Sequence, residues 1–170
     1  MNWSFLRFLN PISKAVAEPV KKATPAVALP AAAFISGWEG RDLIAKHYAH
    51  DPVGVITYCQ GLTNYDNKTV KVGDRFTPEF CNKKFAEALP NYWAQVVRQI
   101  PKADTFPLNR KIALLSFTYN VGEGNLKKSS VRRYLNEGNV QKGCDALRLY
   151  NTAVGSDGKR HILRGLVNRR

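Results

Sequence analysis

Two neighbouring stretches carry the strongest signals in this chain: Trp38-Glu39-Gly40-Arg41 and, after nine intervening residues, Asp51-Pro52-Val53-Gly54-Val55-Ile56-Thr57-Tyr58-Cys59-Gln60-Gly61-Leu62-Thr63. The first places an acid at the end of an apolar, helix-like run. The second opens with a turn signature and continues as a β-branched and aromatic run typical of a strand. Because Gly61 permits a second turn, we expect a tight β-hairpin that holds Asp51 and Thr57 on one wall of a cleft.

The acid Glu39 follows a run that suits a helix, with Pro30 in its first turn and Gly37 at its end. The negative end of the helix dipole and the apolar neighbour Trp38 both favour a protonated carboxyl, which a general acid requires. Two carboxylates that face one another from different elements are what hydrolysis of a glycosidic bond needs. Taken alone, Glu39 would be an ordinary surface acid and Asp51 an ordinary turn residue.

The charge balance of the chain is unusual: 26 basic residues stand against 13 acidic ones in 170, a net charge of +13. A chain of this length is expected to form one compact domain with a buried core. The positive excess indicates polyanionic partners, such as nucleic acid, an anionic membrane face or the bacterial wall. The basic residues are scattered, however, so a solvated cationic surface is an equally good interpretation.

The three cysteines, Cys59, Cys81 and Cys144, lack the close spacing of a metal site. Cys81 and Cys144 both fall on apolar faces of expected helices. They are expected either to pair as a disulfide or to remain buried core thiols, and the sequence leaves both outcomes open.

The histidines His47, His50 and His161 have no third ligand at a suitable spacing. We therefore expect exposed or locally bonded histidines and no metal site.

The first 38 residues differ in composition from the rest of the chain. Apolar residues recur at roughly helical spacing among basic ones, and an uncharged run from Ala23 to Trp38 follows. This order resembles an export or membrane-anchoring signal, but the prolines and Glu18 oppose a spanning helix. We favour an amphipathic helix followed by a linker. The expected division is an N-terminal extension over 1–29 and a folded domain over 30–170.

The remainder of the chain predicts a helical lobe. Each apolar stripe at helical spacing is interpreted as core. The expected helices cover 78–89, with Thr77-Pro78 at the start and Pro90 as a break, then 92–100, 108–119 before Gly122, and two segments that begin at the N-caps Ser130 and Asn139.

Four motifs in this order resemble a phage lysozyme (endolysin) of glycoside hydrolase family 24. The resemblance covers about residues 30–170 and is closest to the lambdoid type, which also carries Cys in the hairpin and in two later helices. The motifs are Glu39-Gly40-Arg41, the block from Asp51 to Thr63, Ser116-Phe117-Thr118-Tyr119-Asn120-Val121-Gly122, and Leu163-Arg164-Gly165-Leu166-Val167-Asn168-Arg169-Arg170.

The resemblance implies an α+β lysozyme-like fold, with a small antiparallel hairpin lobe at 48–66 and a mainly helical lobe. It also implies a muramidase without a cofactor. Glu39 would protonate the leaving glycosidic oxygen, while Asp51 would stabilise the transition state and position the attacking water with Thr57. Further substrate-binding residues are expected at Tyr58, Gly61, Tyr119 and Asn120.

The implied partner is bacterial peptidoglycan, with an anionic outer- or inner-membrane surface as a second candidate. No nucleic acid is expected, and the protein is expected to be a monomer. It would be made in the host cytoplasm and act in the periplasm on the cell wall, with transient membrane association through residues 1–38.

Two features of the sequence depart from the family pattern. Asp51 follows Glu39 by twelve positions where the family more usually has nine, so Asp42 and His50 compete with Asp51 for its role. Leu62 stands where the family commonly has His. The alternatives are a catalytically impaired peptidoglycan- or polyanion-binding protein on the same fold and a lytic transglycosylase. A nucleic-acid-binding domain is a more distant alternative, since no basic helix with interleaved aromatics occurs.

Overall fold

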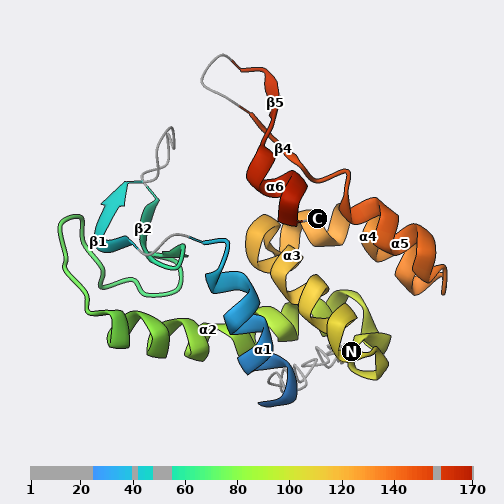
Figure 1. Cartoon of the computed structure of the whole chain (residues 1–170), viewed down its shortest axis with the longest axis horizontal. Coiled ribbons are helices and arrows are strands. Elements are labelled where there is room, and N and C mark those ends of the chain that lie inside the picture. Colours follow the sequence, from blue (N-terminus) through green and yellow to red (C-terminus); the bar gives the residue numbers. More distant parts are fainter. Residues whose placement is uncertain (1–24, 40–41, 48–54, 155–157, 170) are drawn as a thin grey trace, which may run out of the picture.

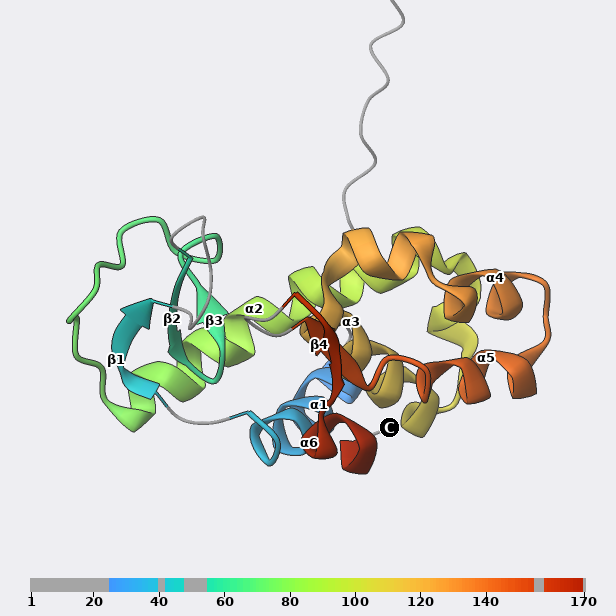
Figure 2. The ribbon, with the colours of Figure 1, turned by 90° about the horizontal axis from the view of Figure 1, so that it is seen from above.

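The computed structural model describes residues 25–39, 42–47, 55–154 and 158–169. These residues form a small β lobe and a mainly helical lobe, connected by the long helix α2 (Pro78–Gln99). Figures 1 and 2 both show α2 extending from beneath the sheet into the helical lobe. The expected α+β class, with a small antiparallel lobe and a helical lobe, is confirmed.

The β lobe is a three-stranded antiparallel sheet in the order β1 (Asp42–His47), β2 (Ile56–Cys59) and β3 (Leu62–Thr63). The strand β1 lies before the expected start of this lobe at residue 48. Its sequence lacks a clean alternation of apolar and polar residues, because Leu43 and Ile44 are both exposed while Ala45 is buried. The residues of β1 therefore show no period-2 hydrophobic pattern from which a strand could be predicted.

An irregularity in β1 explains that missing pattern. Asp42 lies opposite Cys59 and Lys46 lies opposite Thr57, so four steps along β1 match two along β2. The residues of this bulge bond instead to the segment 73–76, where the Ala45 amide donates to the Asp74 carbonyl at 2.8 Å. The bulge thus lets β1 pair on both of its edges.

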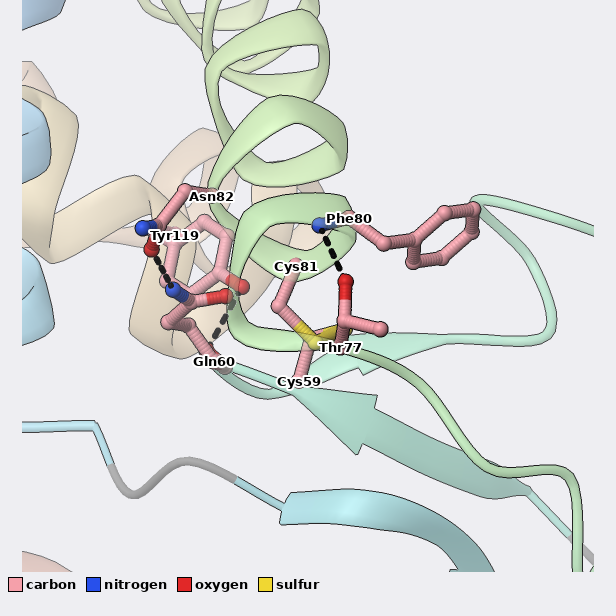
Figure 3. Close-up of a disulfide and its surroundings, with 7 residues drawn as sticks. All are labelled: Cys59, Gln60, Thr77, Phe80, Cys81, Asn82 and Tyr119. Carbon is pink, nitrogen blue, oxygen red and sulfur yellow. Dashed lines mark hydrogen bonds between the residues drawn. A yellow bond between two sulfur atoms is a disulfide. The ribbon is translucent and has the colours of Figure 1, made fainter.

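A disulfide joins Cys59, at the end of β2, to Cys81 in the first turn of α2 (Figure 3). Neither of the two outcomes left open for Cys81 and Cys144 occurs, because Cys81 pairs with Cys59 and Cys144 is an exposed free thiol. The helix that carries Cys144 buries Gly143 and Ala146 instead. Helical periodicity alone placed the buried face one residue away from its true position.

The helix α2 begins as expected and then continues further than expected. The Thr77 hydroxyl accepts a hydrogen bond from the Phe80 amide at 3.2 Å, which confirms Thr77 as the N-cap. The break expected at Pro90 is wrong, because the helix runs through this residue to Gln99. Buried Leu89 and Trp93 flank the proline, and their packing offsets the loss of one backbone hydrogen bond.

The helical lobe contains two elements that the sequence did not indicate, a short C-terminal hairpin and a final helix. The lobe comprises the 3₁₀ helix η1 (Pro101–Thr105), α3 (Leu108–Lys128), α4 (Ser130–Asn136), α5 (Val140–Leu147), β4 (Thr152–Val154), β5 (Arg160–Ile162) and α6 (Arg164–Arg169). The helix α3 is interrupted at Gly122, whose φ of 76° lies outside the helical region.

The N-caps of the last helices were predicted to within one residue. Asn139 caps α5 as expected, since its side chain accepts from the Lys142 amide at 3.1 Å. The cap of α4 is Ser129 rather than Ser130, because the Ser129 hydroxyl accepts from the Arg132 amide at 3.0 Å.

The first described helix, α1 (Pro25–Ser36), starts earlier than expected. Pro30 lies inside it and not in its first turn. Val27, Ala31 and Ile35 recur every four residues on one fully buried face, and this face docks α1 against the helical lobe. No helix among the described residues is long and apolar enough to cross a bilayer.

Candidate active site

The acid Glu39 lies immediately beyond the C-terminal end of α1. The amides of Trp38 and Glu39 both donate to the Ile35 carbonyl, at 2.9 and 3.0 Å. These bonds close the last turn of the helix and fix the backbone that carries the acid. Glu39 is half-buried.

The hairpin turn between β2 and β3 approaches Glu39 closely. Glu39 Oε2 lies 3.5 Å, and the Tyr119 hydroxyl 3.8 Å, from the position that a Cβ on Gly61 would occupy. The Tyr119 hydroxyl donates to the Gln60 carbonyl at 2.9 Å, as Figure 3 shows. Three expected site residues, Glu39, Gly61 and Tyr119, therefore meet where α1, the β lobe and α3 come together.

The turn is held from below by α2 and α3. Gln60 is fully buried, and its side-chain amide donates to Asn82 Oδ1 at 3.0 Å (Figure 3). The Tyr119 ring packs edge-on against Phe85 and Tyr92, with ring centroids 5.3 and 4.8 Å apart. These contacts determine how the turn faces Glu39, since neither the turn nor Tyr119 can shift without disrupting the core.

The expected water-positioning residue Thr57 lies on the central strand β2. It is opposite Lys46 on β1 and Thr63 on β3, and 7% of its surface is exposed. Asp51 and its competitor His50 lie outside the described residues. The other competitor, Asp42, accepts a hydrogen bond from Lys46 at 2.9 Å in an exposed ion pair.

The two remaining substrate-binding candidates differ in exposure. Tyr58 is 1% exposed and packs against Phe76, with ring centroids 5.1 Å apart. Burial, and then the nearby Asp66 carboxylate, raise the pKa of Tyr58. Asn120 is exposed and lines a cavity of about 660 Å³ together with Thr152 and Arg160. The structure therefore places Tyr58 and Asn120 in different surroundings.

A cavity of about 740 Å³ lies between the β lobe, α2 and α3. Its lining includes four residues that the sequence did not single out: Asp66, Tyr92, Gln95 and Glu123. Glu39 is not among the described lining residues. Tyr92, which lines the cavity, packs against the Tyr119 ring of the site.

Hydrogen bonds order the wall of this cavity. The Tyr92 hydroxyl donates to Asp66 Oδ1 at 3.2 Å, and Asp66 Oδ2 accepts from the Thr63 amide at 2.8 Å. Burial, followed by the Asp66 charge, raises the pKa of Tyr92. Tyr92 therefore stays a neutral donor at every physiological pH.

The far wall carries an ion pair between α2 and α3. Arg98 donates to both carboxylate oxygens of Glu123, at 2.7 and 2.9 Å, and Gln99 donates to the same group at 2.8 Å. These bonds, the one from Arg98 foremost, hold the pKa of Glu123 below its usual range. The geometry keeps a charged carboxylate at the cavity edge.

The missed residues carried weak signals in the sequence. Tyr92 recurs at helical spacing with core residues, and Asp66 sits in a turn where Asp is common. Only the fold brings them together. The two described histidines, His47 on β1 and His161 on β5, are both exposed, as expected.

Comparisons with known proteins agree on one family. The profile described as Phage lysozyme matches residues 36–170. The SAR-endolysins of Enterobacteria phages PA-2 and P21 are each 33% identical over 162 residues, covering 94% of this chain and 90% of the relative. The solved endolysin from Escherichia coli O157:H7 phage FAHEc1 superposes with a TM-score of 0.69 at 27% identity, over 87% of this chain and 90% of that one.

Proposed function

The chain belongs to the phage lysozyme family, and from this premise we propose that it cleaves the β-1,4 bond between N-acetylmuramic acid and N-acetylglucosamine in peptidoglycan. It is a lysozyme-type glycoside hydrolase that acts as a phage endolysin. Host cell lysis is its biological use.

The observation that carries the proposed mechanism is the meeting of Glu39, Gly61 and Tyr119. In the mechanism, Glu39 protonates the glycosidic oxygen as the bond to the leaving sugar breaks. Gly61 leaves room for the sugar beside the carboxyl because it has no side chain. Tyr119 positions the turn through its bond to Gln60 and lines the same space.

The second half of the mechanism is assigned to Asp51 and Thr57. Asp51 stabilises the oxocarbenium-like transition state, and Thr57 helps it to hold the attacking water. The bulge in β1 supports this assignment, because it takes up two residues of the long spacing between Glu39 and Asp51. Asp42 is a weaker candidate, since it is already paired with Lys46.

The 740 Å³ cavity is proposed to hold part of the glycan strand. Its phenol, carboxylate and amide groups match the hydroxyl and acetamido groups of amino sugars. The buried Gln95 Oε1, which lines it, has no hydrogen-bond partner among the described residues. A sugar hydroxyl would supply that partner. Tyr58 and Asn120 complete the proposed substrate contacts.

We also propose an oligomeric state, a site of action and a role for the N-terminal residues. The protein would work as a monomer and bind no nucleic acid. It would be made in the host cytoplasm and act in the periplasm, with residues 1–29 as an extension and residues 1–38 associating transiently with the membrane. Fractionation of cells that express the chain with and without residues 1–24, which precede α1, tests the export role. Equal retention of both forms in the cytosol until the membrane is breached would contradict it.

Product analysis tests the reaction itself. The purified protein is incubated with peptidoglycan, and the fragments are examined by mass spectrometry and by a reducing-end assay. Muramidase action yields new reducing ends on N-acetylmuramic acid. Anhydromuramic ends would instead indicate a lytic transglycosylase, and binding without new ends would indicate the catalytically impaired protein.

A further inference from the structure

A separate cavity of about 660 Å³ lies where α3 ends and α4 begins. We name it the basic pocket. It carries four basic side chains and one acid, which gives a local charge of 4 − 1 = +3. Its described lining residues are Lys127, Lys128, Ser129, Ser130, Arg132, Arg133, Asn136 and Glu137.

Three of the four cations have no ion-pair partner within 4 Å among the described residues. Arg133 is 3.8 Å from Glu137, and both side chains are more than half exposed, so this ion pair is weak. Lys127, Lys128 and Arg132 form no ion pair with any carboxylate in the described part of the chain. The Nε of Arg132 is moreover buried and lacks an acceptor within that part. A buried donor of this kind is costly unless a ligand satisfies it.

The walls of the basic pocket are rigid. The Ser129 hydroxyl donates to the Leu126 carbonyl at 2.7 Å, which ties the end of α3 to the start of α4. The Asn136 side chain donates to the Gln99 carbonyl at 3.0 Å, at the end of α2. Val131 and Leu135, on the same helix, are buried in the core. The cations therefore converge on a built cavity and are not scattered along a loop.

We propose that the basic pocket binds the phosphate headgroups of anionic phospholipids and docks the protein on an anionic membrane surface. Guanidinium and ammonium groups are the side chains that hold phosphate oxygens, and the Ser130 hydroxyl adds a neutral donor. The proposal goes beyond the hydrolytic function and does not depend on it. None of the residues that line the basic pocket also lines the 740 Å³ cavity.

A lipid surface fits this site better than a nucleic acid. Sequence-tolerant binding of single strands relies on open aromatic faces on which bases stack. The described lining of the basic pocket contains no aromatic residue, and the ring of Tyr134, on the same helix α4, is already covered by the Arg133 guanidinium at 4.2 Å. A phospholipid headgroup needs only the positive charges and the donors.

The test compares two triple variants of the full chain. The pocket variant carries Lys127→Gln, Lys128→Gln and Arg133→Gln, all at exposed positions, so that folding is preserved. The matched control carries Lys68→Gln, Lys71→Gln and Lys102→Gln, which are exposed lysines outside the basic pocket. Both variants have a net charge of 13 − 3 = +10.

Binding is measured to phosphatidylcholine vesicles with and without phosphatidylglycerol, and to a DNA duplex at the same salt concentration. The pocket variant is expected to lose at least about tenfold in affinity for the anionic vesicles, and the control less than about threefold. Both should retain wild-type hydrolysis of purified peptidoglycan. The proposal is overturned by equal losses in the two variants, by no loss in the pocket variant, or by an equally large loss of DNA binding. The affinity of the single variant Arg132→Gln for the anionic vesicles is measured as a second test, and it should also be lower than that of the wild type.

Discussion

At Gly61, one missing side chain determines how closely the β lobe approaches Glu39. The glycine has a φ of 88°, a conformation in which other residues are strained, and it faces the Glu39 carboxylate. A glycine is therefore favoured at position 61 for two reasons: its positive φ, and the space that it leaves beside the Glu39 carboxylate. Gln60 and Tyr119 then hold the turn in place.

The first prediction separates these two demands on Gly61. Gly61→Ala is expected to lose about 1–2 kcal/mol of stability from backbone strain and to reduce hydrolysis, because a methyl group fills the space beside Glu39. Gly73→Ala is the matched control, since Gly73 has a φ of 92° with nothing within 4 Å. It should lose similar stability but little activity. Equal activities of the two folded variants would contradict this account of Gly61.

The second prediction concerns the ion pair of Glu123 with Arg98. Because the pKa of Glu123 is lowered in the fold, the pair stabilises the protein above the ordinary Glu pKa of about 4.3, and that stability is lost as the pH falls through the lower folded value. Glu123→Gln should lower the free energy of unfolding by up to about 1 kcal/mol at pH 7, since the pair is partly exposed.

Denaturant unfolding at pH 7 and pH 3 measures that difference. The gap between wild type and Glu123→Gln should shrink at pH 3. When Arg98 is already replaced by Gln, the effect of Glu123→Gln on stability should be the same at both pH values. A gap of the same size at both pH values would show that charge is not its cause.

At the scale of elements, contacts between elements decided features that local sequence patterns did not predict. Pro90 indicated a helix end, yet buried Leu89 and Trp93 keep α2 continuous. The strand β1 was missed because a bulge removes its period-2 pattern. The disulfide partner of Cys81 was left open, because spacing alone cannot choose among three cysteines.

Predictions that rested on local chemistry were the more successful ones. Thr77 and Asn139 cap helices as expected, since an N-cap needs only its own side chain and the following amides. Glu39, Gly61 and Tyr119 were named from motifs and do come together. Asp66 and Tyr92 were missed, because their meeting depends on how α2 crosses the β lobe.

The third prediction tests the contact between α4 and α5. A Cβ on Gly143 would lie 2.6 Å from Leu135 Cδ2, which is closer than packing allows. Gly143→Ala should therefore destabilise the protein by about 1–3 kcal/mol, although alanine is the better helix former. Gly124→Ala is the control, because nothing lies within 4 Å of its Cβ position. That variant should gain up to about 1 kcal/mol, and thermal unfolding compares the two. Stabilisation by both substitutions would refute the close contact.

For the whole molecule, the helix α2 and the disulfide between Cys59 and Cys81 are two of the connections that hold the β lobe to the rest, alongside the hydrogen bond from Tyr119 on α3 to Gln60. The disulfide closes a sequence separation of 22 residues. It anchors the end of β2, next to the turn that faces Glu39, onto the first turn of α2. The position of the β lobe relative to Glu39 thus depends on these links.

The fourth prediction removes the covalent link. The double variant Cys59→Ala/Cys81→Ala should lose about 3 kcal/mol of stability, from the loop entropy that the disulfide removes from the unfolded chain. For a chain of this size, that loss corresponds to a midpoint lower by roughly 6–12 °C. The control Cys144→Ala alters an exposed free thiol and should leave the midpoint unchanged. A larger drop for Cys144→Ala than for the double variant would contradict the assigned pairing.

The central claim is that Glu39, at the junction of the two lobes, is the general acid of a muramidase. The most direct test measures the clearing of outer-membrane-permeabilised bacteria by Glu39→Gln, with Glu79→Gln, an exposed acid in the first turn of α2, as the matched control. The account predicts a loss of roughly 10²–10⁴-fold for Glu39→Gln with the fold intact, and near wild-type clearing for Glu79→Gln. Clearing by folded Glu39→Gln at the wild-type rate would contradict it.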